Sequence, residues 1–139
     1  MDSNDVCKGQ DGGAPQSPYL SIEKEMEMHC AHYLKEHDGK CNEMHGHTYK
    51  VKVTLWGNID LKTNMLVDVG VLKDLIIKPH DHKCLNLTMN TENPTMEFMA
   101  WKLAHDLDEV LPENIDEINI EVWETKTASA YYCLDREVE

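Results

Sequence analysis

Two stretches in the first half of the chain alternate between apolar and polar residues. Residues 20–34 place five residues on one parity, with one interruption at Lys24: Ile22, Met26, Met28, Cys30 and His32. A second alternation begins at His45 and continues to Leu55, with lysines and threonines on its polar parity. A period of two is typical of a β-strand with one buried face and one wet face. The polar residues 35–44 between them predict a loop.

The rest of the chain predicts two helices and further strands. Residues 65–69, 118–122 and 128–134 are predicted as short strands, and residues 71–77 as a two-turn helix that stops before Pro79. A longer helix is predicted to begin at Asn93-Pro94, with proline at its first position, and to end at Pro112. Its apolar residues form one stripe: Met96, Met99, Ala100, Leu103, Leu107, Val110 and Leu111. The order β-β-β-α-α-β-β predicts an α+β domain with a mostly antiparallel sheet.

Length, composition and charge narrow the class of protein. The 139 residues suffice for one domain, predicted over 19–139, and residues 1–18, rich in Gly, Pro, Ser, Asp and Gln, are predicted to be a flexible extension. The net charge of −13 argues against general nucleic-acid binding, which needs a basic footprint. No apolar run is long enough for a membrane span, and no signal-peptide pattern is present. Five irregularly spaced cysteines suit a reducing compartment, so a cytoplasmic location is expected.

Three histidines fall where the first two strands would meet. His45 and His47 are two residues apart in a strand, so their side chains project to the same side, about 6–7 Å apart. His32 ends the apolar face of the preceding strand. Antiparallel pairing of the two strands would bring the three imidazoles together, which is the arrangement of a catalytic zinc site with an open fourth position. A His-x-His pair in a strand is more often a pair of polar edge residues, and the spacing alone leaves that alternative open.

Two further groups are candidates for proton transfer. Cys41 lies four residues before His45 and next to Lys40, and a thiol near a dication and a lysine is favoured as the thiolate, so Cys41 is a candidate base. Asp81-His82 pairs a carboxylate with an imidazole, the usual partners in a proton relay. The alternatives are an ordinary loop cysteine and an ordinary polar dipeptide.

Glu124 continues the apolar parity of the strand at 118–122. Its carboxylate would then enter the dry side of the sheet, where it must be paired or hydrogen-bonded. A ligand that presents several N–H donors would satisfy it. Alternatively, the strand ends at Trp123 and Glu124 is solvated.

Five motifs occur in an order that resembles a known family. They are C-A-H-Y-L at 30–34, C-N-E-M-H-G-H at 41–47, D-H-K-C-L-N at 81–86, T-E-N-P-T-M-E at 91–97 and V-W-E-T-K-T-A at 122–128. Together they resemble the 6-pyruvoyl-tetrahydropterin synthase / 6-carboxy-tetrahydropterin synthase family over roughly residues 20–134. The resemblance implies the tunnelling fold, an antiparallel four-stranded sheet with two helices on one face. It also implies a homo-oligomeric barrel in which two trimers stack into a hexamer.

The resemblance also implies roles for nine residues. The zinc (Zn2+) ligands would be His32, His45 and His47. The catalytic base would be Cys41, with Asp81 and His82 of a neighbouring subunit as its relay partners. Glu124 would anchor the pterin ring, and Thr91 and Glu92 would line the pterin pocket.

The implied substrate is 7,8-dihydroneopterin triphosphate. In the carboxy branch, triphosphate and acetaldehyde are lost and 6-carboxy-5,6,7,8-tetrahydropterin is formed for 7-deazaguanine (queuosine-type) biosynthesis; in the pyruvoyl branch only triphosphate is eliminated. The E-N-P-T-x-E and E-T-x-T-A motifs resemble the bacterial carboxy members more than the animal enzymes, so the carboxy reaction is expected. A pterin- or metal-binding protein of the same fold without turnover is the second class, since fold does not fix function.

Overall fold

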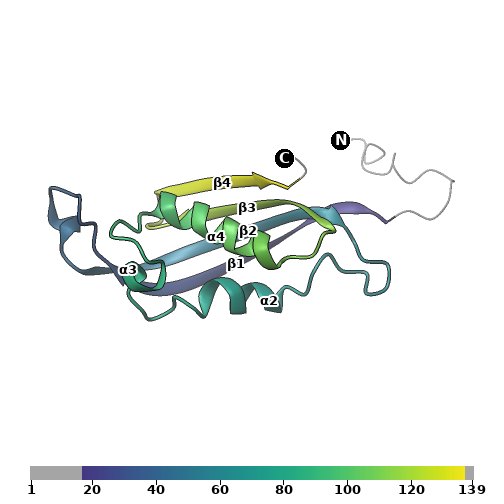
Figure 1. Ribbon diagram of the computed structural model, residues 1–139, viewed down its shortest axis with the longest axis horizontal. Coiled ribbons are helices and arrows are strands. Elements are labelled where there is room, and N and C mark those ends of the chain that lie inside the picture. The colour runs from purple at the N-terminus through teal and green to yellow at the C-terminus, as the bar shows by residue number, and fades with distance from the viewer. Residues whose placement is uncertain (1–16, 137–139) are drawn as a thin grey trace.

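A four-stranded antiparallel sheet forms the body of the protein, seen in a computed structural model that describes residues 17–136 (Figure 1). The strands lie side by side in chain order: β1 (Tyr19–His32), β2 (His45–Asn58), β3 (Ile115–Trp123) and β4 (Ser129–Asp135). β1 and β4 are therefore the two edges of this sheet. The predicted extension at 1–18 falls almost entirely outside the described residues.

The helices lie on one side of the sheet (Figure 1). They are α2 (Gly70–Leu72), which continues as a π-helical turn η2 (Lys73–Ile77), then α3 (Leu85–Thr88) and α4 (Met96–Val110). The apolar stripe of α4 packs on β3 and β4, and the inward parities of β1, β2 and β3 complete the core. None of the helices within residues 17–136 is long and apolar enough to cross a bilayer.

The predicted strand at 65–69 is wrong. Within the described residues this segment makes one isolated bridge, between Asp60 and Met65, and then turns toward α2. Its apolar residues pack against the core instead, and Leu66 is buried there. Burial of this side chain stabilises the fold more than pairing as a short edge strand would. The structure also contains α3, which the sequence pattern did not predict, whereas the predicted helix at 71–77 corresponds to α2 and η2.

The start of α4 is displaced from the predicted position. Thr95, not Asn93, is the N-cap, and its hydroxyl oxygen accepts a hydrogen bond from the backbone N–H of Phe98 at 3.1 Å. The side chain of Asn93 is used elsewhere, as an acceptor for the backbone N–H of Glu36. Pro94 lies one residue before the cap, and its carbonyl takes part in the site described below. The helix ends at Val110, just before Pro112, as predicted.

The register of β1 and β2 positions the histidines. His32 pairs with His45, and Cys30 pairs with His47, at the very end of the ladder. Side chains alternate along each strand, so His32 and His47 lie on the helix-covered side, while His29 and Thr48 lie on the open side. At the β1 edge, the chain at 82–84 runs alongside: His82 donates its backbone N–H to the carbonyl of His29, and Ala31 donates to Lys83. The predicted site residues of β1 and β2 and the segment at 82–84 thus lie at one end of the sheet.

Candidate metal centre and active site

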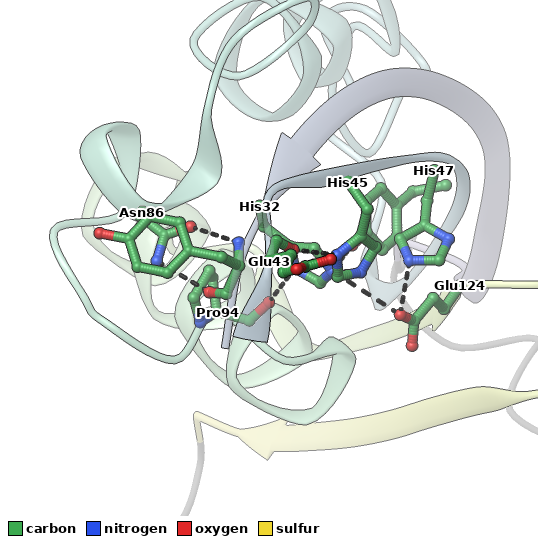
Figure 2. Close-up of polar contacts among 9 residues, drawn as sticks. His32, Glu43, His45, His47, Asn86, Pro94 and Glu124 are labelled. Carbon is green, nitrogen blue, oxygen red and sulfur yellow. Dashed lines mark hydrogen bonds and ion pairs between the residues drawn. The ribbon is translucent and has the colours of Figure 1, made fainter. Parts of the chain in front are cut away.

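Three imidazoles and one carboxylate converge at this end of the sheet (Figure 2). One ligand atom from each of His32, His45, His47 and Glu124 lies within 4.8 Å of all the others. His32 ends β1, His45 and His47 begin β2, and Glu124 follows β3, so three strands contribute. The strand pairing therefore brings the three predicted histidines together.

Hydrogen bonds to backbone carbonyls orient two of the rings. His32 Nδ1 lies 2.9 Å from the Pro94 carbonyl oxygen, and His45 Nδ1 lies 2.7 Å from the Glu43 carbonyl oxygen (Figure 2). A carbonyl can only accept, so both Nδ1 atoms must carry the proton. The Nε2 atoms of the neutral rings are then left with lone pairs that point into the cluster. This is how metal-binding histidines are usually held, with the second nitrogen donating to a carbonyl or carboxylate.

The two bare nitrogens face each other at close range. His32 Nε2 and His45 Nε2 are 3.0 Å apart, and two unprotonated nitrogens at that distance repel each other because neither supplies a hydrogen. A cation between them removes the repulsion. Zn–N bonds of about 2.0–2.1 Å in tetrahedral geometry place two nitrogens about 3.3 Å apart, close to the observed separation. The geometry therefore fits a bound metal ion.

His47 and Glu124 complete the set. Glu124 Oε1 is 3.0 Å from His47 Nε2 and 3.8 Å from His32 Nε2. The short distance to Glu124 is not by itself a hydrogen bond, because the geometry must also be suitable. Among the described residues, the buried His47 Nε2 has no hydrogen-bond partner. An unpartnered buried nitrogen aimed into a cluster of acceptors is a second indication that this cluster could hold a cation. Glu124 lies one residue beyond the end of β3, but its backbone N–H still bonds the Ala128 carbonyl, which keeps the carboxylate on the inner parity.

The protonation of the rings suits metal binding. Burial lowers the pKa of His32, opposed by the hydrogen bond to Pro94, and the neighbouring imidazoles lower it further. Burial also lowers the pKa of His47, opposed by the charge of Glu124. A lowered pKa keeps an imidazole neutral to lower pH, and the neutral ring is the form that binds a metal. The fully buried Tyr49 packs against both rings and keeps water from that side.

Cys41 lies in the loop that joins the two histidine-bearing strands. It is the middle residue of a 3₁₀ turn η1 (Lys40–Asn42), its side chain is half-buried, and its carbonyl accepts a hydrogen bond from the Leu34 N–H at 2.8 Å. That hydrogen bond holds the backbone of Cys41 next to Leu34, which follows His32 by two residues. The loop at 35–44 is thus predicted correctly as polar, but it contains a short ordered turn at the cysteine.

The Asp81-His82 pair lies beside the β1 edge, next to His29. Asp81 Oδ1 accepts the backbone N–H of His29 at 2.8 Å, which is the main cause of its lowered pKa, and Asp81 Oδ2 lies 3.6 Å from His82 Nε2. The His82 side chain is 74% exposed, and its backbone has a φ of 60°, an uncommon conformation outside glycine that often marks functional positions. A hollow of about 570 Å³ opens here, lined by residues that include His29, His47, Thr48, His82 and Lys83.

Thr91 and Glu92 lie in the loop before α4. The Thr91 hydroxyl accepts the backbone N–H of Asn93, and the Glu92 carboxylate forms an exposed ion pair with Lys35 at 3.0 Å. The carbonyl of Glu92 accepts the Lys35 N–H. This loop is therefore fastened to the chain that leaves His32.

Sequence reasoning missed Asn86 and the role of the Pro94 carbonyl. Asn86 is buried and hydrogen-bonds the backbone of Tyr33, the residue after His32 (Figure 2). His80 is also buried, and its Nδ1 lies 2.7 Å from the Thr88 hydroxyl oxygen. The sequence shows only an asparagine between Leu85 and Leu87, which does not identify its partners.

Comparison with known proteins gives a consistent result. The family model described as "PTPS: 6-pyruvoyl tetrahydropterin synthase" matches residues 21–134. The chain is 34% identical over 119 residues to a 6-carboxy-5,6,7,8-tetrahydropterin synthase of Synechocystis sp., covering 80% of this chain and 91% of the relative. It is 36% identical over 105 residues to the 6-pyruvoyl tetrahydrobiopterin synthase of Homo sapiens, covering 68% and 70%. The solved structure of the Caenorhabditis elegans 6-pyruvoyl tetrahydropterin synthase superimposes with a TM-score of 0.68 at 28% identity, covering 85% and 97%.

Proposed function

The chain belongs to the 6-pyruvoyl tetrahydropterin synthase family, and we propose that it is a zinc-dependent 6-carboxy-5,6,7,8-tetrahydropterin synthase. The reaction converts 7,8-dihydroneopterin triphosphate and water into the carboxy product, acetaldehyde and triphosphate. The single observation that carries the proposal is the cluster of His32, His45, His47 and Glu124. Support for the carboxy product comes from relatives named for it, among them the Synechocystis protein.

The donor set favours zinc. Three neutral imidazoles with a fourth position open to substrate are typical of catalytic zinc sites. We assign the three ligands to His32, His45 and His47. When bound, the metal would act as a Lewis acid toward substrate oxygens and make the neighbouring protons easier to remove.

The chain's own groups would move those protons. Cys41 is proposed as the base that takes a proton from the substrate side chain, since a thiolate is both a good acceptor and not needed as a ligand here. His82 is the proposed second proton carrier. Asp81 is held by the backbone of His29 and lies beside the His82 ring, so it can orient the imidazole and stabilise its protonated form.

The product distinguishes the two branches of the family. The human relative, named for the pyruvoyl reaction, is as similar in sequence as the Synechocystis one, so the pyruvoyl reaction is the second candidate. Incubation of the zinc-loaded protein with dihydroneopterin triphosphate should release acetaldehyde and triphosphate in equal amounts. Triphosphate without acetaldehyde would assign the pyruvoyl reaction, and no turnover by zinc-loaded protein would leave only a binding function.

Glu124→Gln is expected to weaken pterin binding and leave the metal in place. In the proposed complex the carboxylate accepts N–H groups of the pterin, and glutamine replaces one acceptor by a donor. Loss of a charge-assisted hydrogen bond in a desolvated site should cost about 1.5–3 kcal/mol, or roughly 10- to 150-fold in Kd, measured by calorimetry with a pterin.

Glu121→Gln is the matched control for this prediction. Glu121 lies on the same strand but on the open face, where its carboxylate contacts Ser129 and Lys52. Its substitution should leave pterin affinity unchanged. If Glu124→Gln instead released zinc without changing pterin affinity in zinc-saturated protein, Glu124 would be a fourth ligand and not the pterin anchor.

We further propose that the active site is shared between subunits of a homo-oligomer. The ring of His82 contacts that of His29, whose side chain lies on the open side of the sheet, whereas the three proposed metal ligands lie on the helix-covered side. The side chain of His82 is 74% exposed, so a neighbouring copy of the chain could reach its ring. The sheet edges at β1 and β4 would be closed by copies of the chain in a hexameric barrel, an arrangement that leaves no edge exposed.

Two inactive variants should restore activity in a mixed oligomer. Cys41→Ala and His82→Ala are each expected to be inactive alone, because each lacks one of the proton carriers. When the two are unfolded and reassembled together, some interfaces should combine an intact Cys41 with an intact His82, and activity should partly return. A mixed oligomer that is shown by mass spectrometry to contain both chains, yet stays inactive, would place each site within one subunit.

A further inference from the structure

Asn86 is one of four buried polar or charged residues among residues 17–136. The others are His32, His80 and Asn119. Asn86 lies in α3, on the segment that crosses beside the end of β1. Its exposed fraction is 7%, so its amide must find partners within the protein. Those partners lie on two different segments. One segment follows His32 in the chain, and the other contacts the His32 ring.

The first partner is the backbone of Tyr33. The Tyr33 N–H donates to Asn86 Oδ1 at 3.0 Å, and Asn86 Nδ2 donates to the Tyr33 carbonyl at 2.9 Å. The β1–β2 ladder ends at the His32–His45 pair, so Tyr33 does not pair with a residue of β2. The asparagine side chain replaces that strand by making the same two bonds, a donor and an acceptor. It therefore fixes the backbone immediately after the metal-facing histidine.

The second partner is the loop that binds the ring of His32. Asn86 Nδ2 also donates to the Glu92 carbonyl at 3.3 Å. The backbone carbonyl of Asn86 accepts the Thr91 N–H at 3.2 Å. Two residues after Glu92, the Pro94 carbonyl accepts Nδ1–H of His32 at 2.9 Å. One amide thus holds both the strand that carries His32 and the loop that sets the direction of its ring (Figure 2).

We infer that Asn86 is a positioning residue for the metal ligand His32. It keeps the Pro94 carbonyl and the end of β1 at the separation that selects the Nδ1–H form of the ring and aims Nε2 at the cluster. The inference rests on the proposed function, because it assumes that the cluster binds zinc. Partners that orient a metal-binding histidine in this way typically change metal affinity by about 10–100-fold when they are removed.

The partners of Asn86 also fix which substitution is most informative. Nδ2 faces two carbonyl oxygens, and Oδ1 faces an N–H, so the amide has one possible orientation. In Asn86→Asp the side chain keeps its size, but an oxygen replaces Nδ2 and repels both carbonyls. Asn86→Ser removes all three side-chain hydrogen bonds without adding charge. Asn119→Asp is the matched control, because Asn119 is equally buried and donates to the Glu117 carboxylate, in the middle of β3 and on the parity opposite to that of Glu124.

The test measures metal binding and the His32 ring in the full chain. Zn2+ affinity, from competition with a chelator, is expected to fall about 10–100-fold in Asn86→Asp and Asn86→Ser and to stay within about twofold of wild type in Asn119→Asp. In the metal-free proteins, ¹⁵N NMR of the imidazoles should show His32 as the Nδ1–H form in wild type and Asn119→Asp. A mixture of ring forms is expected in the Asn86 variants.

The outcomes separate this inference from the proposed function. Wild-type affinity in both Asn86 variants, with an unchanged His32 ring, would overturn the positioning role even if the enzyme is a zinc synthase. If wild type itself bound no Zn2+, the proposed function would fail, and the NMR comparison alone would still decide whether Asn86 orients His32. Should Asn86→Asp fail to fold, Asn86→Ser carries both measurements.

Discussion

A His45→Ala variant is expected to lose its zinc and its catalytic activity while keeping its fold. His45 is the ring whose Nε2 faces that of His32 at 3.0 Å, so removing it takes away one of three neutral nitrogen donors. The side chain is only partly buried and lies at the first residue of β2, outside the packed core, so the cost in stability should be small. Metal content by mass spectrometry of the purified protein should be near one zinc per chain in wild type and near zero in the variant.

His105→Ala is a suitable control for that experiment. His105 lies in α4 and contacts Tyr132 and Trp101, away from the cluster. It should retain zinc and activity. A His45→Ala protein that is free of metal and as active as wild type would end the assignment of these histidines to a catalytic metal.

The antiparallel sheet could be predicted from the sequence because each strand has two different faces. The alternation around Met28 and Val51 sets which residues point inward, and a slip of one residue in register would turn all of them to water. The same constraint places His32, His45 and His47 on one side. The convergence of the three rings was therefore predictable without any knowledge of the loops between the strands.

Segments whose conformation depends on contacts with other segments could not be predicted in the same way. The start of α4 was placed two residues early because Asn93 and Pro94 suit a helix start locally. In the structure their polar groups bond Glu36 and His32 instead. The segment at 65–69 is apolar enough for a strand, but Leu66 packs into the core.

The hydrogen bonds that hold His32 in place could not be predicted for the same reason. Asn86 contacts Tyr33 across 53 positions of sequence, and Pro94 contacts His32 across 62. No local period links residues so far apart, and one sequence alone contains no other signal for such a contact. The parity of Glu124 did predict that its carboxylate would enter the inner side, although β3 itself ends one residue earlier.

Replacing Cys41 with alanine should reduce turnover by about 10²–10⁴-fold, the usual effect of removing a general base, which corresponds to about 3–5 kcal/mol in the activation barrier. Zinc content and pterin affinity should stay at their wild-type levels, since the donor set of the cluster does not include the thiol. The backbone bond from Leu34 to the Cys41 carbonyl does not depend on the side chain, so the loop should keep its position. The measurement is the single-turnover rate of triphosphate release at saturating substrate.

Cys133→Ala is the matched control, because Cys133 is an exposed cysteine on β4, outside the cluster. Its turnover should equal that of wild type. A Cys41→Ala enzyme as fast as wild type would mean that another group removes the proton. His82 and Glu43 are the candidates: His82 opens into the hollow that His47 also lines, and the carbonyl of Glu43 already orients His45. Because that carbonyl is part of the backbone, Glu43→Gln would keep the orientation of His45, and a loss of turnover in this variant would assign the base to the Glu43 carboxylate.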